Sequence, residues 1–229
     1  SKDTQEALRG FGITCPLVVV GRGVDTTRFS PKHRSENLRK QWDADENTRV
    51  MLYVGRLSPE KEVQVLIESY ANLQTIQPHK TKLVIVGDGP DFARLKSLPE
   101  AKGVIFTGSL RGQDLAAAYA SADVFVFASQ VETFGNVVLE AMASGLPVIA
   151  YDYACAHQYL THGVNGWLSP LGQKNHFIQQ IYQLPSVKQL REMGVQACHK
   201  VQQSGWQLPV QQLEQAFYQV VKEPSLDFT

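Results

Sequence analysis

The chain has 229 residues, and its 22 lysine and arginine residues balance 22 aspartate and glutamate residues, so its formal net charge is zero. A hydrophobic content of 43% excludes a disordered chain, and 17 glycines with 11 prolines exclude a collagen-like one. The neutral balance removes any global electrostatic reason to bind nucleic acid or an anionic membrane. Cys15, Cys155 and Cys198 are too few and too far apart for a disulfide framework, so a reducing, cytoplasmic setting is expected.

The predicted elements begin with a short strand at 17–20, which ends at the glycines of residues 21–23. Five further apolar runs predict strands at 50–54, 82–86, 104–107, 123–127 and 147–150. Helical patterns follow four of them, at 60–73, 91–97, 113–120 and 135–143. Continuous apolar strands that alternate with helices are typical of a parallel sheet covered on both faces. Right-handed crossovers then give a doubly wound, Rossmann-like α/β domain.

The end of the chain is different, because it has helical patterns at 175–184, 187–203 and 209–222 with no strand between them. These segments are rich in glutamine, so they are predicted to lie on the surface or to dock on another unit.

Three predicted strands end in glycine, at Gly55, Gly87 and Gly108. Ligands of open α/β sheets bind at the carboxyl ends of the strands, where bare backbone lets them approach closely. A tight turn alone also explains a single glycine. Three of them, each followed by polar or charged residues, favour a ligand site.

Two cations, Arg56 and Lys61, lie in the turn after the strand at 50–54. An arginine can bond two phosphate oxygens at once, and a lysine adds a mobile point charge. Ser58 is expected to cap the next helix, with Pro59 at its first position. Judged by charge alone, a phosphate site and a pair of solvated surface charges are equally good interpretations.

Two carboxylates, Glu132 and Glu140, follow the strand at 123–127. Gly135 and Asn136 open the next helix, whose free N–H groups attract a diphosphate. Glu132 is expected in the loop after this strand, over the ligand edge of the sheet. Glu140, eight positions on in the next helix, is expected about two turns along and on the same side, within about 80° at 3.6 residues per turn. Carboxylates beside an anion site are explained if they accept hydrogen bonds from sugar or ribose hydroxyls. Glu132 is also explained as an acid near a helix N-terminus, whereas Glu140, in an apolar helix, requires a partner.

Other familiar sequence motifs are incomplete or absent. Residues 87–90 hold only the first half of GxGxxG, which disfavours an NAD-binding domain. The P-loop, HExxH and GxSxG patterns are missing, and the scattered histidines suggest no metal site.

Taken together, the motifs resemble the C-terminal, donor-binding domain of family 4 retaining glycosyltransferases of the GT-B fold. The resemblance rests on stretches that follow the family's order, at 23–31, 54–61, 86–90, 120–123, 132–148 and 163–166. It implies that residues 21–204 bind a nucleotide sugar and that 1–20 end a missing N-terminal acceptor domain or form a linker. Residues 205–229 then correspond to the C-terminal helix that crosses back to that domain.

The resemblance also implies roles for single residues. Arg56 and Lys61 resemble the pair that holds the donor's diphosphate and neutralises the leaving nucleotide, and Glu132 resembles the acid that contacts the donor sugar. The implied donor-binding positions are Gly55, Ser109, Leu110, Thr133, Phe134, Gly135, Asn136, Val137 and Glu140. Among them, Ser109 and Leu110 face the base, 134–137 offer backbone amides to sugar and phosphate, and Glu140 takes the ribose hydroxyls. Such enzymes usually need no catalytic metal or other cofactor.

Within the family, residues 21–25 and 132–137 are most similar to mannosyltransferases that use GDP-mannose, and enzymes that add sugars to lipids from UDP donors are close. The expected reaction is transfer of a hexose, such as mannose, from GDP-mannose or a UDP-sugar to a lipid or glycan. The family's Gly-Gly and Glu after the fifth strand are replaced by Ala154, Cys155 and Gln158, which leaves the donor open.

Because the acceptor domain lines the other wall of the cleft, the 229 residues alone are expected to bind donor weakly and to transfer nothing. The whole protein is expected in the cytoplasm, or at the inner face of the membrane if the missing domain contacts it. Two alternatives stay open. One is a nucleotide-sugar binding or regulatory module without transfer activity, and the other is a different GT-B enzyme such as a sugar-nucleotide epimerase.

Overall fold

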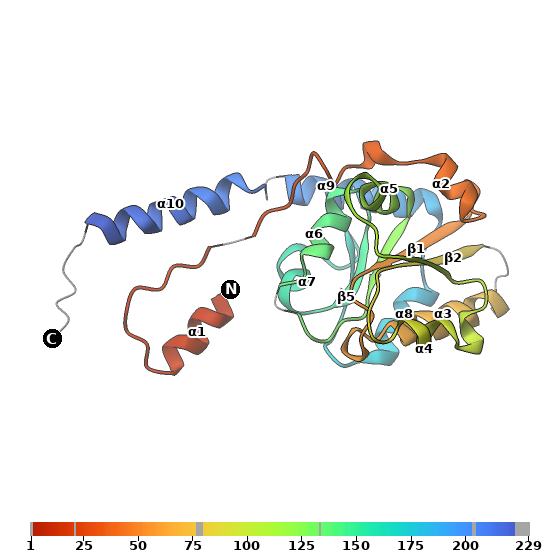
Figure 1. The fold of residues 1–229 in the computed structure, drawn as a ribbon, viewed down its shortest axis with the longest axis horizontal. Coiled ribbons are helices and arrows are strands. Elements are labelled where there is room, and N and C mark those ends of the chain that lie inside the picture. Colours follow the sequence, from red (N-terminus) through yellow and green to blue (C-terminus); the bar gives the residue numbers. More distant parts are fainter. Residues whose placement is uncertain (1, 21, 77–79, 133, 203–204, 223–229) are drawn as a thin grey trace.

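The computed structural model describes residues 2–20, 22–76, 80–132, 134–202 and 205–222. Its strands form one six-stranded parallel sheet in the order β3-β2-β1-β4-β5-β6 (Figure 1). They are β1 (Arg49–Val54), β2 (Thr81–Val86), β3 (Ile105–Gly108), β4 (Val124–Phe127), β5 (Val148–Tyr151) and β6 (Gly166–Ser169). The order reverses between β1 and β4, and open α/β sheets bind ligands at such a point. The predicted doubly wound fold is confirmed.

Helices cover both faces of this sheet. Figure 1 shows α3 (Val63–Ile76), α4 (Phe92–Lys96) and α8 (Lys174–Tyr182) on one face. The other face carries α2 (Glu36–Gln41), α5 (Gly112–Ser121), α6 (Asn136–Ala143) and α9 (Val187–Gln202). The strands are therefore apolar on both sides, and every side chain from Val50 to Tyr53 is fully buried.

The β1–β4 ladder is short. β1 pairs with β2 along its whole length, from Arg49–Thr81 to Val54–Val86, but with β4 only at Met51–Val124 and Leu52–Phe125. Beyond Leu52 the two strands run on without pairing, so their carboxyl ends border an opening at the switch point.

A buried ion pair fixes the opposite end of β4. The fully buried Arg39 donates hydrogen bonds to Asp123 Oδ2 and to the Ser121 carbonyl, both at 2.9 Å, and Asp123 Oδ2 also accepts from the Val50 amide at 2.9 Å. A buried charge requires such partners. The stretch 120–123 thus ties α2 and α5 to the sheet.

The predicted strand at 17–20 is wrong, because these residues belong to no strand. Sheet formation needs a neighbour that satisfies the backbone, and here side chains of α1 (Lys2–Gly10) take nearby carbonyls instead. Gln5 donates to the Leu17 carbonyl at 2.7 Å, and Arg9 donates to those of Ile13 and Cys15 at 2.8 and 2.9 Å.

The structure adds elements that the sequence patterns did not predict, namely α2, β6 and α7 (Ala154–Tyr159). Strand β6 pairs with β5 at the sheet edge, and its sequence Gly-Trp-Leu-Ser lacks the β-branched residues that marked the other strands. The predicted helices agree with the observed ones to within three residues at each end.

The last helix, α10 (Gln207–Lys222), and α1 lie apart from the helices that cover the sheet, on the same side of the molecule (Figure 1). Residues 22–24 lie directly against the residue before α10, since a Cβ on Gly23 would overlap the Trp206 backbone. Among the described helices, none combines the length and apolar character needed to cross a bilayer.

Candidate functional site

A cleft of about 380 Å³ opens at the carboxyl ends of β1 and β4, where the sheet reverses. Its lining is Val54, Gly55, Arg56, Glu60, Lys61, Phe127, Glu132, Gly135, Asn136 and Val137. Seven of these were predicted as site residues from the sequence, on two segments about 75 positions apart. The fold brings both segments to one place.

Lys61 is fixed in this cleft by a network of acceptors. Its Nζ donates to Glu132 Oε1 at 2.5 Å, to the Val131 carbonyl at 2.8 Å and to Ser129 Oγ at 3.2 Å. The side chains of Lys61 and Glu132 are each only 16% exposed. The two predicted residues thus form a mostly buried ion pair, which holds the lysine in place before any ligand arrives.

The backbone beside Lys61 departs from the predicted helix. Residues Pro59–Lys61 form a single 3-10 turn, Glu62 adopts left-handed angles (φ 47°, ψ 34°), and α3 starts only at Val63. This conformation costs a non-glycine residue roughly 1–2 kcal/mol. The Tyr151 hydroxyl donates to Glu62 Oε2 at 3.2 Å and fixes the side chain there.

Ser58 does not cap a helix as predicted. It precedes the 3-10 turn, its side chain makes no capping bond, and its hydroxyl donates instead to Glu60 Oε1 at 2.6 Å. That hydrogen bond is the main reason why the pKa of the Glu60 carboxyl is lowered. Glu60 therefore stays ionised on the wall of the cleft.

Arg56 lies at the mouth of the cleft with its side chain exposed and without an ion-pair partner among the described residues. Its carbonyl accepts a hydrogen bond from the Tyr53 hydroxyl at 3.0 Å, and this hydroxyl lies under Gly55, where a Cβ would be only 2.8 Å from it. The tyrosine thus positions the turn that carries Arg56.

Helix α6 begins at the cleft. Gly135 has left-handed angles (φ 89°, ψ 49°), which favour glycine, and the helix starts at Asn136. The amides of Asn136 and Val137 fall in its first turn, where no helical carbonyl accepts from them. Backbone donors and the positive end of the helix dipole therefore face the same space as Lys61 and Arg56.

The two acids lie where their sequence context predicts, one in a loop and one in a helix. Glu132 precedes α6 and lies in a loop, whereas Glu140 is inside α6 and lines a second cavity of about 180 Å³. Asn136 lines both cavities, so they are neighbours. The rest of the second cavity comes from Gly23, Val24, Asp25, Arg28, Phe29 and Trp206.

Glu140 has the partner that its apolar helix requires. The Tyr119 hydroxyl donates to Glu140 Oε2 at 2.9 Å. Burial raises the pKa of the Glu140 carboxyl, against the hydrogen bond from Tyr119 and the positive charge of Arg28, which lower it. The carboxylate thus keeps one oxygen on Tyr119 and can accept further hydrogen bonds in the cavity.

The other predicted site residues are placed less directly. Phe134 lies under the Arg22 guanidinium, 6.0 Å from its ring centre, and its carbonyl accepts from the Cys155 amide at 3.0 Å. Ser109 and Leu110 follow β3 and line neither cavity. Thr133 lies outside the described residues.

The glycines at 87 and 89 have a packing role. A Cβ on Gly87 would overlap the Gly55 carbonyl oxygen, and one on Gly89 would overlap that of Leu57. The Leu57 amide donates to the Asp88 carbonyl at 2.9 Å, and the Asp91 amide donates to the Leu57 carbonyl at 3.0 Å. The loop after β2 therefore braces the loop that carries Arg56.

Sequence reasoning missed the residues that hold the site, above all Tyr53, Tyr119, Ser129 and Tyr151. Each lies within or just after an apolar strand or small-residue helix, where periodicity gives no functional signal. No group of three His, Cys, Asp or Glu side chains within the described ranges could hold a metal ion.

Residues 34–200, well over half of the chain, match the family model described as "Glycosyl transferases group 1". The chain belongs to this family. Over 156 residues it is 47% identical to a "GDP-mannose-dependent alpha-mannosyltransferase" of Mycobacterium tuberculosis, an alignment that covers 68% of this chain and 39% of the relative. The chain spans about two fifths or less of the curated relatives that bear this name.

Solved structures of glycosyltransferases share the fold. The sucrose-phosphate synthase of Thermosynechococcus elongatus superposes with a TM-score of 0.80 at 24% identity, over 97% of this chain and 57% of that one. Anabaena HepE in complex with UDP superposes with a TM-score of 0.75 at 25% identity, over 97% of this chain and 62% of that one. The sheet of this group 1 glycosyl transferase chain is thus one half of a GT-B fold.

Proposed function

We propose that this chain is the donor-binding part of a retaining glycosyltransferase, which transfers a hexose from a nucleoside-diphosphate sugar to a lipid or glycan acceptor. One observation carries the proposal: Arg56, the Lys61–Glu132 pair and the open first turn of α6 converge on one cleft at the switch point of the sheet.

The cleft suits the departure of a nucleoside diphosphate. When the bond between the anomeric carbon and the diphosphate breaks, negative charge develops on the leaving phosphate oxygens. Two cations and the amides of Asn136 and Val137 stabilise that charge, and they cost no reorganisation because Lys61 is already held in position. The cation pair thereby does the work of a divalent metal ion.

Glu132 has two tasks in this proposal. Its Oε1 fixes Lys61, and its other carboxylate oxygen is free to accept hydrogen bonds from the donor sugar or to face the positive charge that develops at the anomeric centre. Phe134 and Gly135 continue the same wall toward the sugar.

The second cavity suits the ribose of the nucleotide. Glu140 is oriented by Tyr119 and can accept hydrogen bonds from two vicinal hydroxyls. Asn136 links this cavity to the phosphate cleft, as a single bound nucleotide sugar requires.

For the donor we propose GDP-mannose. Relatives 42–51% identical to the chain carry the name "GDP-mannose-dependent alpha-mannosyltransferase". A UDP-sugar is the second candidate, because HepE, which is 25% identical, has been solved with UDP.

A nucleotide-sugar panel tests the proposal on the chain itself. Ligands that bind only the native state raise the melting temperature with their affinity, so GDP-mannose, UDP-glucose, NAD and ATP can be ranked side by side. We expect stabilisation by GDP-mannose above all others, and loss of it in Lys61→Ala. If neither GDP nor UDP compounds are preferred over NAD and ATP, the proposal is wrong.

A further inference from the structure

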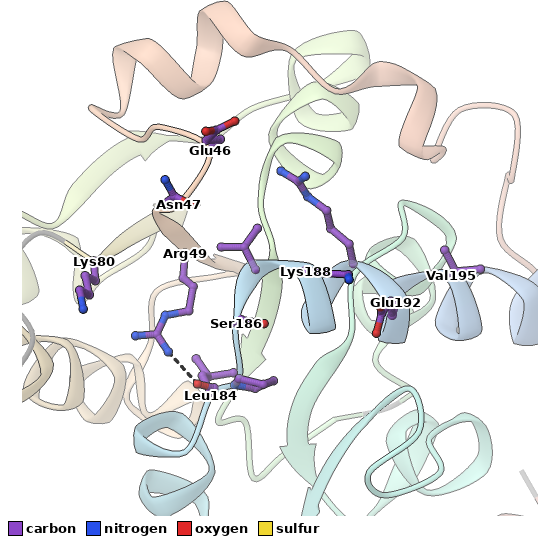
Figure 2. A pocket seen from close by; sticks show the side chains of 12 residues that line it. Glu46, Asn47, Arg49, Lys80, Leu184, Ser186, Lys188, Glu192 and Val195 are labelled. Atoms are coloured by element: carbon purple, nitrogen blue, oxygen red, sulfur yellow. Dashed lines mark hydrogen bonds between the residues drawn. The ribbon is translucent and has the colours of Figure 1, made fainter.

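A cavity of about 790 Å³ lies at the amino ends of the strands, opposite the proposed donor cleft. Figure 2 shows that its walls come from the start of β1, the residues before β2 and the first turns of α9. It shares no lining residue with the cleft at Arg56 and Lys61. The proposed function therefore does not account for it.

Positively charged side chains outnumber acidic ones in this 790 Å³ cavity. Four cations line it, namely Arg49, Lys80, Lys188 and Arg191, against the two acids Glu46 and Glu192. Lys80, Lys188 and Arg191 are exposed, and they form no ion pair with another described residue. In a chain with zero net charge, this local excess marks an anion-binding surface.

Arg49 forms the fixed base of the cleft. Its guanidinium is half-buried and donates from Nη1 to the Leu184 carbonyl at 2.7 Å, the bond drawn in Figure 2. Burial lowers the pKa of Arg49, because the charge has lost water. A guanidinium that is partly dehydrated and held in one orientation is suited to phosphate oxygens.

A smaller cavity of about 400 Å³ adjoins the cationic one, and Arg191 and Val195 line both. Its walls include the apolar side chains of Pro31 and Leu146. Ser144 also lines this cavity, with its hydroxyl oxygen buried beneath the wall. The smaller cavity thus offers apolar contacts next to Arg191.

We propose that these two cavities form a second binding site, for a small phosphorylated molecule. Arg49, Lys188 and Arg191 hold its phosphate, and its remaining atoms extend past Val195 into the smaller cavity. The concave shape and the volume of the larger cavity match a small-molecule ligand rather than the flat surface of a membrane or the groove of a nucleic acid.

Binding of inorganic pyrophosphate can be measured by NMR, because the amide signals of the protein report the proposed donor cleft and the cationic cavity separately. On titrating the 229-residue chain, we expect saturable shifts for the amides of residues 187–191, apart from any at Asn136 and Val137. The double variant Lys188→Ala/Arg191→Ala should bind at least tenfold more weakly at these signals. The matched control, Lys40→Ala/Lys102→Ala, removes the same charge from exposed positions outside both cavities and should bind as before.

Three results would overturn the proposal. The first is no shift at 187–191 up to about 10 mM pyrophosphate, an affinity too weak to be specific. The second is equal weakening in both double variants, which indicates diffuse attraction. The third is binding of phosphatidylglycerol vesicles at 187–191 that pyrophosphate does not displace, which indicates a membrane-facing surface instead.

Discussion

At the scale of single residues, the donor cleft depends on charges that are held by the fold. Lys61 has three acceptors from the segment after β4, and Glu140 has one donor from α5. Both are thereby oriented without a ligand, and preorganised charges are the ones that lower a barrier most. Lys61 and Glu140 have different partners, so we expect different effects when each is replaced.

Removing the Lys61 charge should affect the chemical step. In the whole protein, Lys61→Ala is expected to lower kcat about 100-fold or more, because one preorganised group that stabilises the leaving charge is lost. Initial rates of sugar transfer measure this, with Lys102→Ala, an exposed lysine outside the cleft, as the control. Transfer at the normal rate in Lys61→Ala would contradict the assigned role.

Glu140 should make both stability and donor binding depend on pH. Because burial raises its pKa in the folded chain, the native state binds more protons than the unfolded state above pH 4.5, the ordinary value of the group. The free energy of unfolding should therefore fall as pH rises through this window, while nucleotide affinity rises with ionisation. Glu140→Gln should remove both slopes. Urea unfolding and calorimetry across the range from pH 4.5 upward measure them, and unchanged slopes in the variant would disprove this origin.

At the scale of elements, much of the scaffold is predictable from sequence and much of the site is not. The five apolar runs that end near Val54, Val86, Thr107, Phe127 and Ala150 all form strands, because burial on both faces demands continuous apolar residues. The run at 17–20 has the same composition but no neighbouring strand. Pairing is a tertiary property, so composition cannot distinguish the two cases.

The same limit applies to the site. The Arg56–Lys61 and Glu132–Glu140 motifs were found from spacing, and the sheet order explains why they meet. The Lys61–Glu132 pair spans 71 residues, and the left-handed Glu62 departs from the helical pattern of its own segment. Neither follows from local preference, since tertiary contacts impose both.

The first residue of α7 is a strained alanine. Ala154 has φ 50°, in the left-handed region that favours glycine. A left-handed conformation costs alanine roughly 1–2 kcal/mol, and replacement by glycine removes that cost. The unfolded state of the glycine variant is more flexible, which offsets about half of the gain in stability. Ala154→Gly should therefore raise the free energy of unfolding by about 0.5 kcal/mol. Ala156→Gly, inside α7, should lower it by about 1 kcal/mol, and equal effects in urea unfolding would exclude relief of strain.

The contact between α9 and the end of α6 has no room for a side chain. A Cβ on Gly194 would overlap the Gly145 carbonyl oxygen. Helix propensity favours Gly194→Ala by about 1 kcal/mol, but the clash with backbone should outweigh it and lower the free energy of unfolding by about 2 kcal/mol. Gly205→Ala, with nothing within 4 Å, should change little. A more stable Gly194→Ala variant would mean that the helices can move apart.

At the scale of the whole molecule, the chain covers 57% of the sucrose-phosphate synthase and about two fifths of the curated relatives. Helix α10 exposes Val210, Leu213 and Phe217, three and four positions apart, so these apolar side chains lie along one side of the helix. An exposed apolar stripe of this kind is suited to packing against another unit. We propose that this unit is the acceptor domain.

Binding and transfer should therefore separate. If the acceptor domain forms the other wall of the cleft, as proposed, the 229 residues should bind a nucleotide sugar through the described cleft but should not transfer the sugar. Calorimetry with GDP-mannose measures the first, and a radiolabelled transfer assay, with the whole protein as positive control, measures the second. Transfer by the 229 residues alone would show that they contain an acceptor site.

Asn136 lines both cavities, so in the proposed binding mode one peptide position spans the junction between phosphate and ribose. The separation of the two subsites is then set by backbone geometry at the first residue of α6, which side-chain replacement hardly alters. Donor preference can evolve at the outer walls, through Phe134 or the turn after β3, while the central diphosphate-ribose unit stays constant. A fixed distance between the phosphate and ribose subsites would let one scaffold accept different sugars and bases.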